Sequence, residues 1–252
     1  MARQAREKSS TGIYHVMMRG INRQNIYEDD EDRLRFLETL KNYKDKSDFM
    51  LYGYCLMDNH VHLLLQEGNE PISTTVKRIS SSYVFWYNEK YERCGHFFQE
   101  RFNSEVVETD DYFLTVLRYI HQNPLKAGLV TNVTDYLWSS YNSYIKDQKI
   151  IDTSFALNLF SLDKEQARVE YKKFMSEFND DECMEYQEKY KISDNEVRRI
   201  IEEKYDIIPG KFHLLDRKQK NEIFHKLKVS EKISIRQIAR VTGSSKYVVE
   251  KA

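Results

Sequence analysis

Two histidines separated by one residue could bind a metal ion in this sequence. His60 and His62 lie in the segment Tyr-Gly-Tyr-Cys-Leu-Met-Asp-Asn-His-Val-His-Leu-Leu-Leu at residues 52–65. The flanking residues are apolar and β-prone, which predicts a strand, and residues i and i+2 of a strand point to the same face of the sheet. Two imidazoles side by side are a pair of metal ligands. A nucleophile beside such a metal would make this chain an enzyme.

The spacing of the two histidines is weakly specific by itself, because most such pairs on strands are structural or surface side chains. Two neighbouring histidines in an apolar core would need polar partners. We therefore expect His60 and His62 on the open face of the sheet or at its edge.

A second polar pair follows in Leu-Arg-Tyr-Ile-His-Gln-Asn-Pro-Leu-Lys-Ala-Gly-Leu-Val at residues 117–130. Tyr119 and Asn123 are four residues apart, so they share one face of a helix. We expect that helix to end at Asn123, because Pro124 disfavours helical backbone at the residue before it. Since the chain has 18 tyrosines, spacing alone favours a half-buried packing role for Tyr119. His121 is two residues after Tyr119, about 200° further around a helix, so we expect a structural or DNA-facing side chain there.

The elements that must position these residues follow from hydrophobic periodicity. Strands are predicted at residues 12–19, 49–57, 60–66 and 103–108, and helices at residues 29–46, 71–91, 109–123 and 135–145. The order β-α-β-β-α-β-α is the split βαβ, ferredoxin-like arrangement, an antiparallel sheet with helices on one face. The predicted fold class is α+β, with a small all-α domain after the sheet domain.

The C-terminal part reads as a separate helical domain. We expect a domain over residues 1–149, a helical connector over 150–185 and a helical domain over 186–252. Capping patterns at Ser193 and Ser234 begin two of its helices. The residues after Ser234 have helix-turn-helix spacing, with Gly243 at the turn. The recognition helix would cover residues 245–252. A helical hairpin without DNA-binding purpose remains the alternative.

Net charge is −1, but the charges are segregated along the chain. Residues 1–26 have five basic and one acidic side chain, residues 150–185 have four and nine, and residues 186–252 have sixteen and ten. Basic ends can hold a phosphate backbone even when the whole chain is neutral. Ordinary solvated helix surface explains the same charges equally well.

Composition indicates a soluble, cytoplasmic protein with reduced cysteines. The three cysteines are far apart and show no metal spacing. The first ten residues have no apolar segment, so we expect no signal peptide. No stretch approaches the roughly 18 apolar residues of a membrane span, so we expect no membrane partner.

Four separated motifs, in this order, resemble those of the REP-associated tyrosine transposases, which belong to the one-tyrosine HUH single-strand DNA endonucleases. The motifs are Tyr-His-Val-Met-Met-Arg-Gly-Ile-Asn-Arg, Tyr-Cys-Leu-Met-Asp-Asn-His-Val-His-Leu-Leu, Phe-Phe-Gln-Glu-Arg-Phe and Arg-Tyr-Ile-His-Gln-Asn-Pro-Leu-Lys-Ala-Gly-Leu-Val. The resemblance covers residues 12–145, within the expected HUH domain.

The resemblance implies roles for four residues. His60 and His62 correspond to the family's metal-binding histidines and Tyr119 to its nucleophile. The family's third polar ligand, often a glutamine, falls on Asn123, which is shorter by one methylene. The implied reaction is cleavage and strand transfer of single-stranded DNA through a 5′-phosphotyrosine, with a divalent metal. Mg²⁺ or Mn²⁺ suits phosphoryl transfer with so few protein ligands, although imidazoles would also suit zinc.

The expected partners are single-stranded or hairpin DNA and, through the C-terminal domain, duplex DNA. The side chains expected to contact DNA are Arg19, Asn22, Arg23 and Arg101 in the first domain and Arg236, Ser245, Lys246 and Tyr247 in the second. A monomer and a homodimer are both compatible with the sequence.

Three other functions remain compatible with these residues. The chain could be a non-catalytic DNA-binding regulator on the transposase scaffold, although the catalytic positions are all filled. It could be a metallohydrolase that forms no protein–DNA adduct. The histidines could also be packed side chains without a metal.

Overall fold

The computed structural model describes residues 6–146, 150–181, 183–184, 193–205, 207, 209–229 and 233–252. The chain forms two compact units, residues 1–185 and residues 186–252. Each unit has its own cluster of buried hydrophobic side chains. Residues 182 and 185 of the expected connector lie outside the described residues.

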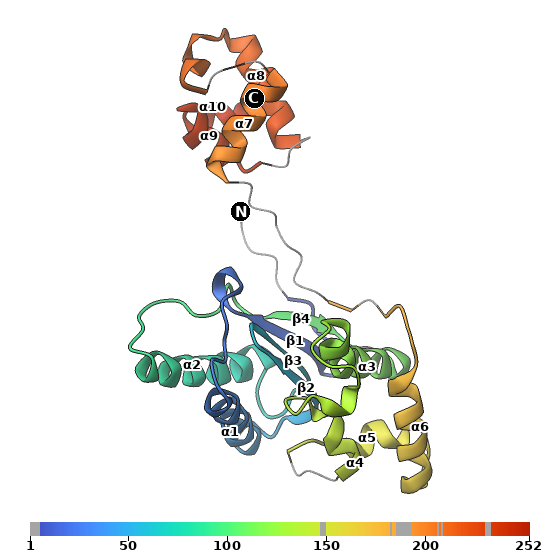
Figure 1. The fold of residues 1–252 in the computed structure, drawn as a ribbon. Helices are drawn as coiled ribbons and strands as arrows, with labels where there is room; N and C mark the ends of the chain where they lie inside the picture. Colours follow the sequence, from blue (N-terminus) through green and yellow to red (C-terminus); the bar gives the residue numbers. More distant parts are fainter. Residues whose placement is uncertain are drawn as a thin grey trace. The chain divides into compact units, whose positions relative to one another are not determined.

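The first unit is built around a four-stranded antiparallel sheet (Figure 1). Its strands, in the spatial order β2-β3-β1-β4, are β1 (Ile13–Arg19), β2 (Met50–Met57), β3 (His60–Gln66) and β4 (Asn103–Val106). Its long helices are α1 (Asp30–Ser47), α2 (Ile72–Lys90) and α3 (Asp110–Lys126). The order of elements and the strand order confirm the split βαβ, ferredoxin-like arrangement and the α+β class.

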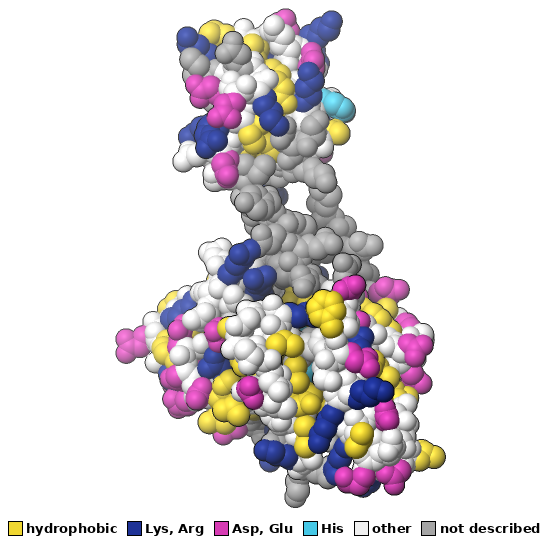
Figure 2. All heavy atoms as spheres, turned by 45° about the vertical axis from the view of Figure 1, so that its right-hand side comes forward, with side chains coloured by type: hydrophobic (Ala, Val, Ile, Leu, Met, Phe, Trp, Pro, Cys, Tyr) yellow, Lys and Arg dark blue, Asp and Glu magenta, His cyan; other side chains and the backbone are white. Residues whose placement is uncertain are grey.

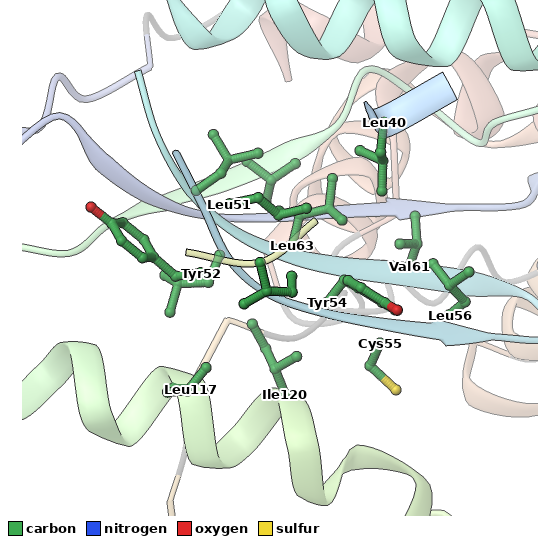
Figure 3. Close-up of a cluster of buried hydrophobic side chains, with 14 of the residues drawn as sticks. Leu40, Leu51, Tyr52, Tyr54, Cys55, Leu56, Val61, Leu63, Leu117 and Ile120 are labelled. Carbon is green, nitrogen blue, oxygen red and sulfur yellow. The ribbon is translucent and has the colours of Figure 1, made fainter. Parts of the chain in front are cut away.

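Helices cover both faces of the sheet, which corrects the expectation of helices on one face. Figure 3 shows Leu117 and Ile120 of α3 on one side of the strands and Leu40 of α1 on the other. All three side chains are fully buried. The sequence pattern showed that α3 has an apolar stripe, but not which face of the sheet the stripe covers.

Gly53 of β2 lies where α3 crosses the sheet. A Cβ atom on Gly53 would come within 2.9 Å of Cδ1 of Leu117, and β2 has a register shift between Leu51 and Gly53. The missing side chain therefore lets α3 approach the sheet closely.

Shorter elements complete the first unit. They are η1 (Ile21–Arg23), η2 (Val133–Asp135), η3 (Ser140–Asn142), α4 (Ser143–Lys146), α5 (Thr153–Asn158) and α6 (Lys164–Ser176). The free edge of β2 is covered by residues 138–140, since the Leu56 N–H donates to the carbonyl of Trp138 and the Tyr54 N–H to Oγ of Ser140. Edge strands covered in this way cannot pair with other chains.

Residues 150–181 pack into the first unit. Ala156 of α5 and Tyr171 of α6 are fully buried in its core. Beyond α6, Arg118 of α3 makes a two-pronged ion pair with Asp181, at 2.7 and 2.9 Å. The segment expected to be a connector therefore contains two helices, α5 and α6. It is held against α3 by the ion pair between Arg118 and Asp181.

Two predicted helix boundaries are wrong. The α3 helix continues through Pro124 to Lys126; Pro124 lies in the last turn, where its missing N–H removes a single intrahelical hydrogen bond. The helix predicted at 135–145 is instead η3 followed by the short α4. Of its aromatic residues, Tyr141 and Tyr144 are buried, and Tyr136 and Trp138 are half-buried.

The second unit is helical. Its elements are α7 (Asp194–Tyr205), η4 (Pro209–Leu214), α8 (Arg217–Val229), α9 (Ile235–Thr242) and α10 (Lys246–Lys251). Gly243 joins α9 to α10 with φ at +69°, as the turn requires. Ile238 and Val249 are fully buried in the unit's core. Among the helices that the structure describes, none is long and apolar enough to cross a membrane.

Replacing Gly53 tests the close approach of α3 to the sheet. We expect Gly53→Val to lower the free energy of unfolding by about 1–3 kcal/mol in urea denaturation, because the side chain overpacks the contact with Leu117. Gly53→Ala should cost less, because the end of the Leu117 side chain can rotate away. Valine is otherwise favoured in strands, so a gain in stability for Gly53→Val would contradict the account.

Candidate active site

The face of the sheet under α3 carries both histidines, and Tyr119 of α3 lies against it. The ring of Tyr119 lies edge-on to that of His62, with centroids 5.7 Å apart, and the His60 and His62 centroids are 5.0 Å apart. The Nδ2 atom of Asn123, one turn after Tyr119, is 3.4 Å from Nε2 of His62. The structure therefore brings together all four residues that the sequence singled out.

The expectation that the histidine pair lies on an open face is wrong. His62 is 1% exposed and Tyr119 is 3% exposed, because α3 covers this face. His60 and Asn123 are partly exposed. The site therefore meets its surroundings on the side of His60 and Asn123.

Buried His62 has the polar partner that the burial requires, which the sequence analysis did not identify. Its Nδ1 lies 2.9 Å from Nε2 of His15 on β1. Burial lowers the pKa of His62 well below its usual value, and nearby His15, His60 and Arg19 lower the pKa further. A neutral imidazole results, which is the form that binds a metal.

The second histidine is oriented by the residue before it. Nδ1 of His60 lies 2.7 Å from Oδ1 of Asn59. Because a carboxamide oxygen only accepts hydrogen bonds, Nδ1 carries the proton and Nε2 keeps its lone pair. This orientation suits a metal ligand.

The donor set fits a small divalent cation. Among the described residues, no group of three or more His, Cys, Asp or Glu side chains could hold a metal ion. Here the third donor is an amide, and the oxygen and nitrogen of Asn123 are assigned from the hydrogen-bond network. The 3.4 Å contact joins Nδ2 of Asn123 to Nε2 of His62, so the amide would have to turn over to present its oxygen to a cation bound there. His60, His62 and Asn123 would hold such an ion.

Three of the expected DNA contacts lie around the histidine end of the sheet. Arg19 is directly opposite His60 in the β1–β3 register. The following loop, with exposed Asn22 and Arg23, is fastened to the β2–β3 turn, where the Gly20 N–H donates to the carbonyl of Asn59 at 2.9 Å. A phosphate backbone at this end would meet Arg19 and the loop together.

Arg101 lies beside the same end of the sheet. It is exposed just before β4, and β4 pairs with β1 up to Asn103 opposite Met17. The pKa of Arg6 is lowered by burial and by the charge of Arg101, so two guanidinium groups lie close together here.

The remaining expected contacts belong to the second unit. Arg236 is exposed on α9, and Lys246 and Tyr247 are exposed at the start of α10. Ser245 caps α10, because its side chain accepts the Val248 N–H. The hydroxyl of Ser245 therefore stabilises the start of α10.

His121 is a core residue and is not exposed to DNA. Its Nε2 lies 2.8 Å from Oγ of Ser140 and its Nδ1 lies 3.0 Å from the hydroxyl of Tyr171. Burial lowers the pKa of His121 to about 3. The side chain stays neutral and joins α3 to α6 and to the segment beside β2.

Two residues near the site were missed from the sequence. His15 is directly opposite Glu105 in the β1–β4 register, and its Nδ1 lies 3.4 Å from Oε2 of Glu105. His15 lies four residues before Arg19 on β1, so the two side chains point to the same face of the sheet, and the sequence could have shown this. The sequence could not show the strand register that brings His15 next to His62.

The resemblance to the HUH tyrosine transposases predicted two alternating histidines on a ferredoxin-like sheet and a tyrosine on a helix beside them, and the structure has this arrangement. Residues 8–123 match the family model described as "Transposase IS200 like". This part of the first unit is therefore similar to the IS200-like transposases, and the resemblance noted in the sequence is confirmed.

Two similar proteins support this assignment. A chain from Haemophilus influenzae named as a REP-associated tyrosine transposase is 24% identical over 160 residues, which cover 58% of this chain and 89% of that one. A solved REP-associated tyrosine transposase bound to a REP hairpin aligns with a TM-score of 0.51 and 18% identity, over 61% of this chain and 96% of that one. The second likeness confirms the fold.

His121→Ala tests the structural role of that histidine. We expect the free energy of unfolding in urea to fall by about 3 kcal/mol, because the change leaves a cavity and two buried hydroxyls without their partner. The exposed His96 provides the control, and His96→Ala should change stability by less than about 0.5 kcal/mol. Equal stabilities for the two variants would contradict the account.

Proposed function

We propose that the first unit cleaves single-stranded DNA and transfers the strand through a covalent bond to Tyr119. The observation that carries the proposal is the placement of Tyr119 against His62, with Asn123 at the free nitrogen of the same imidazole. A phenol beside a metal-binding pair has the parts that nucleophilic phosphoryl transfer needs.

The proposed reaction conserves phosphodiester energy. The Tyr119 oxygen forms a bond to the scissile phosphorus and loses its proton, while the bond from phosphorus to the 3′ oxygen breaks and that oxygen gains a proton. The product is a 5′-phosphotyrosine and a free 3′-OH. A later 3′-OH attacks the phosphotyrosine and restores the phenol, so strands are joined without an external energy source.

His60, His62 and Asn123 would hold the divalent cation, and we propose Mg²⁺ or Mn²⁺ because oxygen and imidazole donors in a small set suit these ions. When bound, the cation would polarise the scissile phosphate. The protein's own contribution is to fix the orientation of both imidazoles and to hold the phenol beside them.

The burial of Tyr119 restricts how DNA can reach it. The partly exposed side chains of the site are His60 and Asn123, so the scissile phosphate must enter on their side. Arg19, Asn22 and Arg23 lie beside this entrance, and Arg101 lies beyond the neighbouring strand. We propose that these side chains hold the flanking phosphates.

The substrate that fits best is a hairpin with a single-stranded flank. This part of the proposal rests on the similar protein that was solved with a REP hairpin. The strongest alternative is a DNA-binding regulator that binds such hairpins without cutting them. A metallohydrolase would cut without becoming attached to the product.

A labelled hairpin oligonucleotide distinguishes these functions. We expect wild-type protein with Mn²⁺ to form a protein–DNA adduct that survives a denaturing gel. Tyr119→Phe should form at least a thousandfold less adduct, because the nucleophile is missing, while hairpin affinity measured by gel shift changes less than about threefold.

Two controls accompany this assay. Tyr14→Phe removes a phenol that bonds the Ser9 N–H outside the site, and it should leave the adduct unchanged. Wild-type protein in EDTA should form no adduct. Adduct from Tyr119→Phe would refute the nucleophile, and cleavage without adduct would indicate a metallohydrolase.

We also propose that the second unit binds duplex DNA through α9 and α10. The support is the turn at Gly243 and the exposed Arg236, Lys246 and Tyr247. Figure 2 shows basic and acidic side chains interspersed over the visible face of this unit.

The triple variant Arg236→Ala, Lys246→Ala, Tyr247→Ala tests this surface. We expect affinity for duplex DNA containing the repeat to fall at least tenfold in fluorescence anisotropy, with a shallower salt dependence, because phosphate contacts are lost. Lys226→Ala removes a basic residue that pairs with Glu222 on α8, and it should change affinity less than twofold. Equal affinities for the two variants would remove α10 from the proposal.

A further inference from the structure

A row of three side chains leads from the edge of the sheet to the candidate metal site. Glu105 on β4, His15 on β1 and His62 on β3 all point to the face that α3 covers. Nδ1 of His15 is 3.4 Å from Oε2 of Glu105, and Nε2 of His15 is 2.9 Å from Nδ1 of His62. Nε2 of His62, at the other end, faces Asn123 at 3.4 Å.

The hydrogen-bonding rules for these groups determine where the protons lie. A carboxylate only accepts, so Nδ1 of His15 carries the proton and points it at Glu105. With the proton of His15 on Nδ1, its Nε2 presents a lone pair and accepts a hydrogen bond from Nδ1 of His62. The proton of His62 must therefore be on Nδ1, which leaves the lone pair of Nε2 directed toward Asn123.

The surroundings keep this arrangement in place. His15 is fully buried, so water cannot substitute for either of its partners. Glu105 is held as an acceptor by the Met184 N–H at 3.1 Å. Although burial acts to raise the pKa of Glu105, the hydrogen bonds from His15, Tyr112 and the Met184 N–H lower it overall, which keeps the carboxylate ionised.

We propose that Glu105 and His15 are positioning residues that hold His62 in the tautomer with its proton on Nδ1. The free Nε2 is then ready to bind the divalent cation. This inference rests on the proposed function for the identity of the cation, but the tautomer itself is a property of the protein without metal or DNA. Partners of this kind behind a metal-binding histidine typically contribute 10–100-fold to metal affinity.

The first test is the protonation of His62 in the full chain. Long-range ¹H–¹⁵N correlation spectra of the metal-free protein at neutral pH distinguish the two neutral tautomers. We expect His62 with its proton on Nδ1 in the wild type. In Glu105→Gln the amide can donate a hydrogen bond to Nδ1 of His15, which reverses the direction of both hydrogen bonds. His62 with its proton on Nε2 should then become populated. A wild-type His62 with its proton on Nε2 would overturn the proposal.

The second test is Mn²⁺ affinity, measured without DNA from the signal of free Mn²⁺ in electron paramagnetic resonance. His15→Leu removes the acceptor for His62 at similar volume and should weaken Mn²⁺ binding 10–100-fold. His15→Gln can present its amide oxygen to His62 and should recover most of the affinity. Equal weakening in both variants would indicate a packing role and contradict the proposal.

Two controls separate this inference from the proposed function. Glu108→Gln changes a carboxylate that bonds Ser10 outside the row, and it should leave Mn²⁺ binding unchanged. His60→Ala should lose Mn²⁺ binding with the tautomer of His62 retained. If wild-type protein binds no Mn²⁺, the proposed function fails, whereas the tautomer spectra still decide the role of Glu105 and His15.

Discussion

The packing of α3 against the histidine-bearing face of the sheet is the constraint on which the site depends. It places Tyr119 edge-on to His62 and Asn123 at the nitrogen that faces away from the sheet. Gly53 permits the close approach, and the ion pair of Arg118 with Asp181 fastens the following segment to the outer side of α3. The proposed nucleophile and the proposed metal-binding pair thus come from elements far apart in the sequence.

The same packing buries polar groups, and the fold compensates for their lost hydration. His62 is satisfied by His15, which is satisfied by Glu105, and His121 is satisfied by two hydroxyls. Burial lowers the pKa of His62 and of His121, so these two imidazoles stay neutral, and both have hydrogen-bond partners within the fold. Rigidity around the site follows from this network, whereas the partly exposed His60 and Asn123 mark where a substrate can approach.

Local sequence patterns predicted the elements well, because strand alternation and helix capping are short-range effects. The strands around His60 and the helix of Tyr119 were found in this way, and four ordered motifs led to the transposase family. The sequence could not show that α3 lies on the histidine face, nor the β1–β3–β4 register that connects His15 to its partners. Both depend on contacts between distant segments. The predicted end of α3 at Asn123 was wrong because a proline disrupts the interior of a helix more strongly than its last turn.

The central claim is that a phosphate is transferred to Tyr119 at the metal-binding histidines. The most direct measurement is tandem mass spectrometry of the adduct after nuclease and protease digestion. The account predicts a nucleoside 5′-phosphate on the peptide that contains Tyr119, localised to that side chain, and only when Mn²⁺ or Mg²⁺ is supplied. A nucleotide on another residue, or an unmodified Tyr119 peptide after complete cleavage of the DNA, would contradict it.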